Sequence, residues 1–73
     1  MNEWNRLRLE AEARKSEYPP GCRVQLESMD DPQAPPIGTQ GTVIGVDGIG
    51  SIMVKWDNGS RLNVTTEDRC TKI

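Results

Sequence analysis

Few side chains in this sequence are suited to chemistry. Histidine, the commonest general base and metal ligand, is absent. The two thiols, Cys22 and Cys70, form no CxxC pair, so they cannot complete a four-ligand structural zinc site without carboxylates. Asp30 and Asp31 are adjacent carboxylates before Pro32, a pattern typical of a turn. We therefore predict a non-catalytic protein that holds no metal and no cofactor.

The two cysteines allow two interpretations. Free cysteine is among the most deeply buried residue types, which favours small core side chains at Cys22 and Cys70. A disulfide is the alternative. If the first and last strands pair antiparallel, Cys70 lies near Gln25 and Cys22 near Ile73, so the thiols are close but offset along the strands.

Length and composition restrict the kind of site. A chain of 73 residues allows one domain with a marginal core, since so short a chain buries only about 60% of its unfolded surface. Hydrophobic residues make up 34% of the sequence, and Phe is absent. We therefore expect a surface groove rather than an enclosed cavity. Nine basic and eleven acidic residues give a net charge of −2, without the basic surplus that usually supplies nucleic-acid affinity.

Targeting signals are not evident in the sequence. No segment approaches the ~18 consecutive apolar residues of a membrane span. Residues 1–17 are charged throughout and lack the apolar centre of a signal peptide. We predict a cytoplasmic protein without membrane association.

Residues 1–17 are predicted to form a helix ahead of a β domain over residues 18–73. Trp4, Leu7 and Ala11 make a thin apolar stripe along this helix. A helix of about 15 residues is marginal alone in water, so the stripe must dock on something. Docking on the protein's own β domain is the first choice. Pairing with a second chain, as a weak homodimer rather than a monomer, is the second.

Alternating apolar residues predict five short strands in the β domain. They run over residues 22–27, 39–47 and 51–56, through Leu62 and Val64, and over residues 69–73. A long first loop followed by tight turns is typical of a small five-stranded SH3-like barrel, whose closure removes exposed sheet edges. We thus expect a mainly β fold: an N-terminal α-helix followed by this barrel.

The expected strand faces follow from turn chemistry. Residues 57–59 are predicted to form a three-residue hairpin loop with Gly59 left-handed, which sets Ile52 opposite Val64. A β-bulge near Ile44 and Gly45 turns Ile44 outward. The predicted common core comprises Val24, Leu26, Val43, Val46, Ile52, Val54, Leu62 and Val64.

A series of motifs over residues 18–73 resembles the bacterial and phage domain-of-unknown-function family 4314. They are Tyr18-Pro19-Pro20-Gly21-x-Arg23-Val24-x-Leu26, Met29-Asp30-Asp31, Pro35-Pro36-x-Gly38-Thr39-x-Gly41-Thr42-Val43, Gly45-Val46-Asp47, Ile49-Gly50 and Val54-Lys55-Trp56-Asp57-Asn58-Gly59-Ser60. The resemblance implies a small β domain of bacteria, phages or mobile elements, and no activity. The helix lies outside it. A weaker likeness over residues 41–43 and 54–60 is to Mind-bomb/Herc SH3-like repeats, which bind peptides, and to KOW-type modules, which associate with nucleic acid or ribosomes.

Two surfaces are candidates for a protein partner. Trp56, Tyr18 and Pro36 would line an aromatic groove for an extended peptide, with Asp30 and Asp31 beside it. Strand alternation nevertheless places Trp56 on the core side, so core packing is the competing interpretation.

The second candidate surface is an apolar patch of Ile44, Ile49 and Met53, although singly exposed apolar residues are ordinary. These features predict a binding module for a protein partner. Nucleic-acid binding through Arg23, Lys55, Arg61 and Arg69 is the alternative, weighed against an ordinary solvated face.

Overall fold

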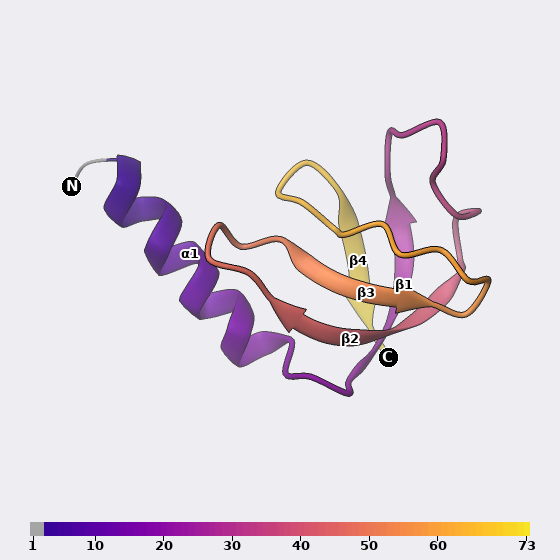
Figure 1. Ribbon diagram of the computed structural model, residues 1–73, viewed down its shortest axis with the longest axis horizontal. Coiled ribbons are helices and arrows are strands. Elements are labelled where there is room, and N and C mark those ends of the chain that lie inside the picture. The colour runs from indigo at the N-terminus through magenta and orange to yellow at the C-terminus, as the bar shows by residue number, and fades with distance from the viewer. Residues whose placement is uncertain (1–2) are drawn as a thin grey trace.

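The computed structural model describes the backbone of residues 3–73 and the side chains of residues 8–73. Within this part of the chain there are one helix and four strands (Figure 1). They are α1 (Glu3–Glu17), β1 (Arg23–Ser28), β2 (Gln40–Val46), β3 (Ile52–Trp56) and β4 (Arg69–Lys72). The fold is therefore mainly β with one N-terminal helix, as predicted.

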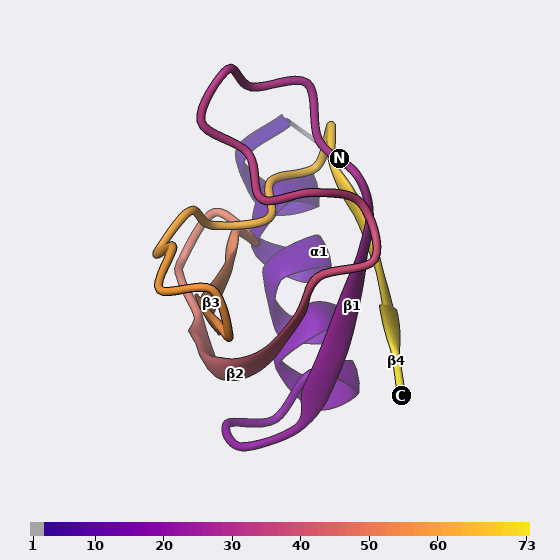
Figure 2. The ribbon, with the colours of Figure 1, turned by 90° about the vertical axis from the view of Figure 1, so that its right-hand side faces the viewer.

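All four strands belong to one antiparallel sheet in the order β3-β2-β1-β4. Figure 2 shows this sheet bent through β2, with β3 on one side and β1 and β4 on the other. Within residues 3–73 the sheet stays open, with β3 and β4 as its outer strands. The prediction of a closed, five-stranded SH3-like barrel is therefore wrong.

The missing fifth strand has a local cause at Leu62. The predicted pair Ile52 and Val64 does form, with each N–H donating to the other carbonyl at 2.8 Å. Next to it, the Leu62 carbonyl accepts a hydrogen bond from Trp56 Nε1 at 2.8 Å, and the Leu62 N–H donates to Ser60 Oγ at 3.4 Å. Leu62 makes these side-chain hydrogen bonds in place of a ladder pair with Val54, and the segment makes the single bridge at Val64 instead of a strand.

The core lies on one face of the bent sheet, here called the inner face. It is built by buried side chains of Val24, Leu26, Val43, Ile52, Val54, Trp56 and Val64. Val46 packs against this cluster only in part, and the predicted core residue Leu62 is half-buried outside it. Trp56, the largest fully buried side chain, helps to fill the interior of a chain that has no Phe.

The predicted bulge and hairpin turn are both confirmed. The register between β2 and β3 shifts between Val43 and Gly45, and Ile44 is 49% exposed. Gly59 has a φ of +94°, the left-handed conformation that a three-residue hairpin loop requires. Turn chemistry is local, which explains why the sequence predicted these two features correctly.

The C-terminal half of α1 docks on the protein's own sheet. Ala11 is 2% exposed, and a Cβ added to Gly50, in the β2–β3 turn, would lie 3.6 Å from the Ala11 Cα. Arg14 Nη1 donates to the Gly50 carbonyl at 2.9 Å, and Lys72 Nζ donates to the Glu17 carbonyl at 2.8 Å. This half of the helix therefore docks on the protein's own β domain, as expected.

The side chains of Trp4 and Leu7 lie outside the described residues. In the part of the chain that is described, no helix combines the length and the apolar character needed to span a bilayer.

Candidate functional site

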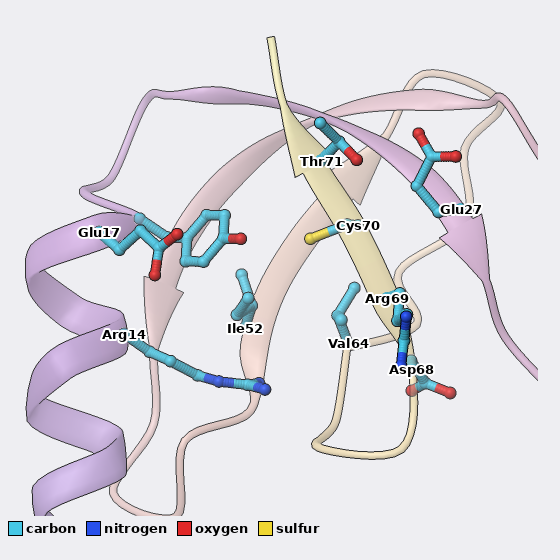
Figure 3. Close-up of a pocket in the computed structure, with 10 residues that line it drawn as sticks. Arg14, Glu17, Glu27, Ile52, Val64, Asp68, Arg69, Cys70 and Thr71 are labelled. Carbon is cyan, nitrogen blue, oxygen red and sulfur yellow. The ribbon is translucent and has the colours of Figure 1, made fainter.

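One candidate site is a cleft of about 520 Å³ between the end of α1, the bridge of β3 to Val64, and β4. The side chains around it come from α1 and the residue after it, β1, β3, the segment before β4, and β4 itself (Figure 3). They are Arg14, Glu17, Tyr18, Glu27, Ile52, Val64, Asp68, Arg69, Cys70 and Thr71. We call this site the α1–β4 cleft.

The α1–β4 cleft exists because the sheet does not close. β3 and β4 are the two outer strands, and the space between them is covered on one side by the end of α1. Buried Ile52 and Val64 form an apolar floor. Figure 3 shows Arg14 reaching from α1 on one side of this floor, with Arg69 and Asp68 on the other. The result is an apolar base with a rim of mixed charge.

Tyr18 and Cys70 share one wall of the α1–β4 cleft and affect each other's ionisation. Burial, followed by the nearby Cys70 thiol, raises the pKa of the Tyr18 phenol, while Arg14 opposes the shift. Burial also raises the pKa of the Cys70 thiol, and here Arg14 and the Tyr18 hydroxyl oppose the shift. Both groups are therefore neutral at neutral pH. A neutral thiol is a poor nucleophile.

The two cysteines do not form a disulfide. Cys70 pairs with Leu26, one position from the predicted Gln25, and both thiols are free. Cys22 therefore stands four positions along β1 from the partner of Cys70. Four residues of strand span about 13 Å, whereas disulfide-bonded Cα atoms lie within about 7 Å. The disulfide is therefore wrong, and the first interpretation, of two buried core thiols, holds only in part, because both thiols are free but half-buried.

A second hollow, of about 340 Å³, lies between the β1–β2 loop and the segment before β4. It contains Asp30 and Asp31 together with Glu67 and Asp68. Asp31 Oδ1 accepts a hydrogen bond from the Gln33 N–H at 2.8 Å, which is the predicted turn role. Among the described residues, no three Asp, Glu, Cys or His side chains are placed to hold a metal ion.

The predicted aromatic groove does not form. Trp56 is 1% exposed and packs in the core, where its indole N–H is bonded to Leu62. Tyr18 instead lines the α1–β4 cleft, and Pro36 is exposed on the β1–β2 loop. Strand alternation, the competing interpretation, placed Trp56 correctly.

The predicted apolar patch lies at one end of the β2–β3 hairpin. The bulge sets Ile44 and Gly45 across from Met53, so Ile44 and Met53 are neighbours on the outer face. Met53 is half-buried, whereas Ile49 in the turn is 58% exposed. None of these three residues lines the α1–β4 cleft or the second hollow.

The four predicted basic residues are not gathered in one place. Arg23 and Lys55 both pair with Thr42, on the outer face of the sheet. Arg23 forms a two-point ion pair with Asp57, at 2.8 Å and 2.5 Å, which neutralises much of its charge. Arg69 lines the α1–β4 cleft, on the opposite face, and Arg61 is exposed beyond β3. A continuous basic surface of these four residues is absent from the described structure.

Sequence reasoning missed Arg14, Glu17 and Thr71 as site residues. Arg14 and Glu17 were included only in the charged helix predicted over residues 1–17, and Thr71 only in the strand predicted over residues 69–73. Their common location depends on how α1 docks beside β4, which no local motif reports. Cys70 was expected to be a small buried core side chain; it is only partly buried, and it lines the cleft.

Within residues 3–73 these elements define a small, mainly β domain: one helix beside an open, bent sheet of four strands. The family model "Domain of unknown function (DUF4314)" matches residues 8–73. The chain belongs to the DUF4314 family, and the resemblance found in the sequence is confirmed. The match begins within α1, ten residues earlier than the predicted residue 18, so the docked half of the helix is part of the family domain. No curated protein and no solved structure matches the chain.

Proposed function

We propose that this protein is a non-catalytic binding module that engages a protein partner in the α1–β4 cleft. The observation that carries the proposal is a cleft of about 520 Å³ whose apolar floor, Ile52 and Val64, lies between two strands that no further strand joins. Binding sites are typically concave and mostly apolar, with a few polar groups that orient the ligand. The rim of charged side chains meets this description.

The chemistry of the α1–β4 cleft supports binding rather than catalysis. The sequence has no histidine, and the raised pKa values of Tyr18 and Cys70 keep both groups protonated at neutral pH. Enzymes usually shift such groups toward reactivity at the operating pH. Here desolvation raises the pKa of the Cys70 thiol, which leaves less of the reactive thiolate at neutral pH.

The charges favour a protein over a nucleic acid as partner. The α1–β4 cleft has Arg14 and Arg69 against the three acids Glu17, Glu27 and Asp68. A site that binds phosphates requires an excess of cations, because neutralising phosphates supplies most of the affinity. A mixed rim around an apolar base is instead typical of protein interfaces.

A capture experiment with matched variants tests this proposal. The immobilised domain is exposed to a bacterial lysate, and the captured proteins are compared among wild type, Cys70→Gln and Arg69→Glu in the cleft, and Lys55→Glu on the outer face. Circular dichroism first confirms that each variant is folded. A partner protein should bind wild type and Lys55→Glu and be lost with both cleft variants, and the purified partner should show the same order in calorimetry.

Other outcomes contradict the proposal. Capture that survives the cleft variants but is lost with Ile49→Asp would place the interface at the hairpin patch. Salt-sensitive binding of oligonucleotides that weakens with Lys55→Ala or Arg61→Ala would instead indicate the nucleic-acid alternative.

A further inference from the structure

The outer edge of β4 has main-chain groups that the sheet leaves unpaired. Ile73 N–H donates to the Arg23 carbonyl at 3.0 Å, which makes these two residues a hydrogen-bonded pair of the β1–β4 ladder. Hydrogen-bonded and non-hydrogen-bonded pairs alternate along antiparallel strands. The next hydrogen-bonded pair is therefore Gln25 with Thr71, and the N–H and C=O groups of Cys70 and Lys72 point away from β1.

The other side of β1 confirms this alternation. Leu26, the partner of Cys70, uses its own N–H and C=O toward β2, donating to Thr39 and accepting from Gly38, each at 2.8 Å. Among residues 3–73, no main-chain hydrogen bond reaches the outward groups of Cys70 and Lys72. β4 thus presents two donors and two acceptors in the spacing of a strand, directly beside the α1–β4 cleft.

From this arrangement, and resting on the proposed function of the cleft, we infer that the partner binds as an extended peptide that adds a strand to the outer edge of β4. Strand addition to a sheet edge takes its affinity from main-chain hydrogen bonds and its specificity from alternate side chains. Because side chains on one strand alternate between faces, every second residue of the added peptide would point toward the apolar floor of Ile52 and Val64.

The charges of β4 indicate which peptide fits. Its four residues, Arg69-Cys70-Thr71-Lys72, include two cations and no acid. Within residues 8–73 neither cation forms an ion pair, and the Lys72 ammonium donates only to the main-chain carbonyl of Glu17. Cys70 and Lys72 pair with the inner-face residues Leu26 and Val24, so Lys72 lies on the side of the apolar floor, and like charges on one face of neighbouring strands oppose pairing. The partner is therefore an extended peptide with apolar residues, and no cations, at the alternate positions that face the floor, and a second copy of β4 is disfavoured.

The probe for this inference is a synthetic blocked hexapeptide, Glu-Val-Glu-Val-Glu-Val, titrated into the full ¹⁵N-labelled chain. The Cys70 and Lys72 amides should shift downfield and exchange more slowly with solvent as the peptide binds. N-methylation of the valines removes the donors that face β4 and should weaken binding by about fivefold or more, because each lost hydrogen bond matters by about that factor. N-methylation of the glutamates, whose amides point away from β4, is the matched control and should change affinity little.

Two substitutions at one position provide the second test. Lys72→Pro removes the outward N–H without removing a bond to β1, since proline is tolerated where the N–H faces away from the sheet. Lys72→Ala removes the same side chain and keeps the N–H. Strand addition predicts that Lys72→Pro binds the hexapeptide at least about fivefold more weakly than Lys72→Ala does. The counterpart Glu-Ser-Glu-Ser-Glu-Ser, which lacks the apolar residues that face the floor, should bind more weakly than the valine peptide to every variant.

Failure of this inference is distinct from failure of the proposed function. If the valine peptide does not bind, or binds equally with methylated valines and with Lys72→Pro, strand addition is wrong. The proposed function is then tested only by whether the partner captured from the lysate requires the cleft residues. If that partner depends on the cleft variants but binds Lys72→Pro and Lys72→Ala equally, the cleft binds a protein in another manner.

Discussion

Gly41 on β2 lies directly under the indole of Trp56 on β3. The two residues are paired in the antiparallel register, and a Cβ added to Gly41 would lie 2.8 Å from Trp56 Cε3 and 2.9 Å from the Lys55 carbonyl oxygen. Such distances are shorter than normal van der Waals contact, so only glycine fits here without a shift of the sheet. The position of Trp56 in the core therefore depends on a residue that has no side chain.

Gly41→Ala should destabilise the domain by about 1–3 kcal/mol, the usual cost of overpacking a well-packed core. One of the crowded atoms is main-chain, which limits relaxation. Urea denaturation followed by Trp fluorescence measures the free energy of unfolding. Gly48→Ala is the control, because an added Cβ there meets nothing within 4 Å, and it should change the free energy by no more than about 0.5 kcal/mol. Equal stability of the two variants would contradict the close approach.

The ion pair of Arg23 and Asp57 predicts a dependence of stability on pH. The Arg23 guanidinium, first by hydrogen bonding and then by its charge, lowers the pKa of the Asp57 carboxyl in the folded protein. A folded-state pKa below the unfolded value of about 3.9 means that the contribution is complete above that pH and is lost as the pH falls through the folded pKa.

Asp57→Asn should therefore lower the free energy of unfolding at pH 7, and the difference from wild type should shrink toward zero as the pH is lowered below 4. Both side chains are well exposed, so the difference should be small and should diminish further in 1 M salt. Urea denaturation at a series of pH values checks this. Asp30→Asn, in the acidic hollow, is the comparison, and a difference for Asp57→Asn that stayed constant down to pH 2 would speak against the ion pair.

The contact of Arg14 with the Gly50 carbonyl predicts that α1 depends on the sheet for its stability. Arg14→Ala removes a partly buried hydrogen bond at 2.9 Å and should cost about 1 kcal/mol. Because an isolated helix of this length is marginal, amide exchange in α1 should accelerate more than exchange in β1. Exposed Lys15→Ala is the control and should leave both unchanged. Uniform acceleration throughout the chain would show that the helix does not unfold separately.

The raised pKa of the Cys70 thiol predicts slow alkylation. In a Cys22→Ser variant, the single remaining thiol should react with iodoacetamide slowly at pH 7 and faster only above the ordinary thiol pKa of about 8.5, since the thiolate is the reactive form. Mass spectrometry follows the reaction over time. The same variant in 6 M urea provides the reference rate, and a folded protein that reacted as fast as the unfolded one would show that Cys70 is neither buried nor shifted.

Much of the strand pattern was predictable from the sequence because it is encoded by neighbouring residues. Alternation along 22–27 and 51–56 identified the inner-face residues Val24, Leu26, Ile52 and Val54, and also placed Trp56 on that face. Gly59 and the bulge at Ile44 follow from local backbone preferences. Each of these features depends on residues close together in the chain, so side-chain alternation or a local backbone preference is enough to predict it.

The closure of the sheet was not predictable in this way. The pattern that contains Leu62 and Val64 is that of a strand, yet the indole N–H of Trp56 takes the Leu62 carbonyl and leaves only the Val64 bridge. Whether a main-chain group bonds to a strand or to a side chain depends on what tertiary packing brings within reach. The alternation of apolar and polar residues does not indicate which of these two partners the main-chain group will bond.

The sequence by itself determined a small, mainly β domain of the DUF4314 family with an N-terminal helix, an inner apolar face and no histidine chemistry. Only the tertiary structure decided that the sheet is open, that α1 docks beside β4, and that Arg14 and Cys70 therefore border one cleft. The reason is that side-chain periodicity specifies which face of an element is apolar, whereas the partner of that face and of each free strand edge is selected by contacts between residues far apart in the chain.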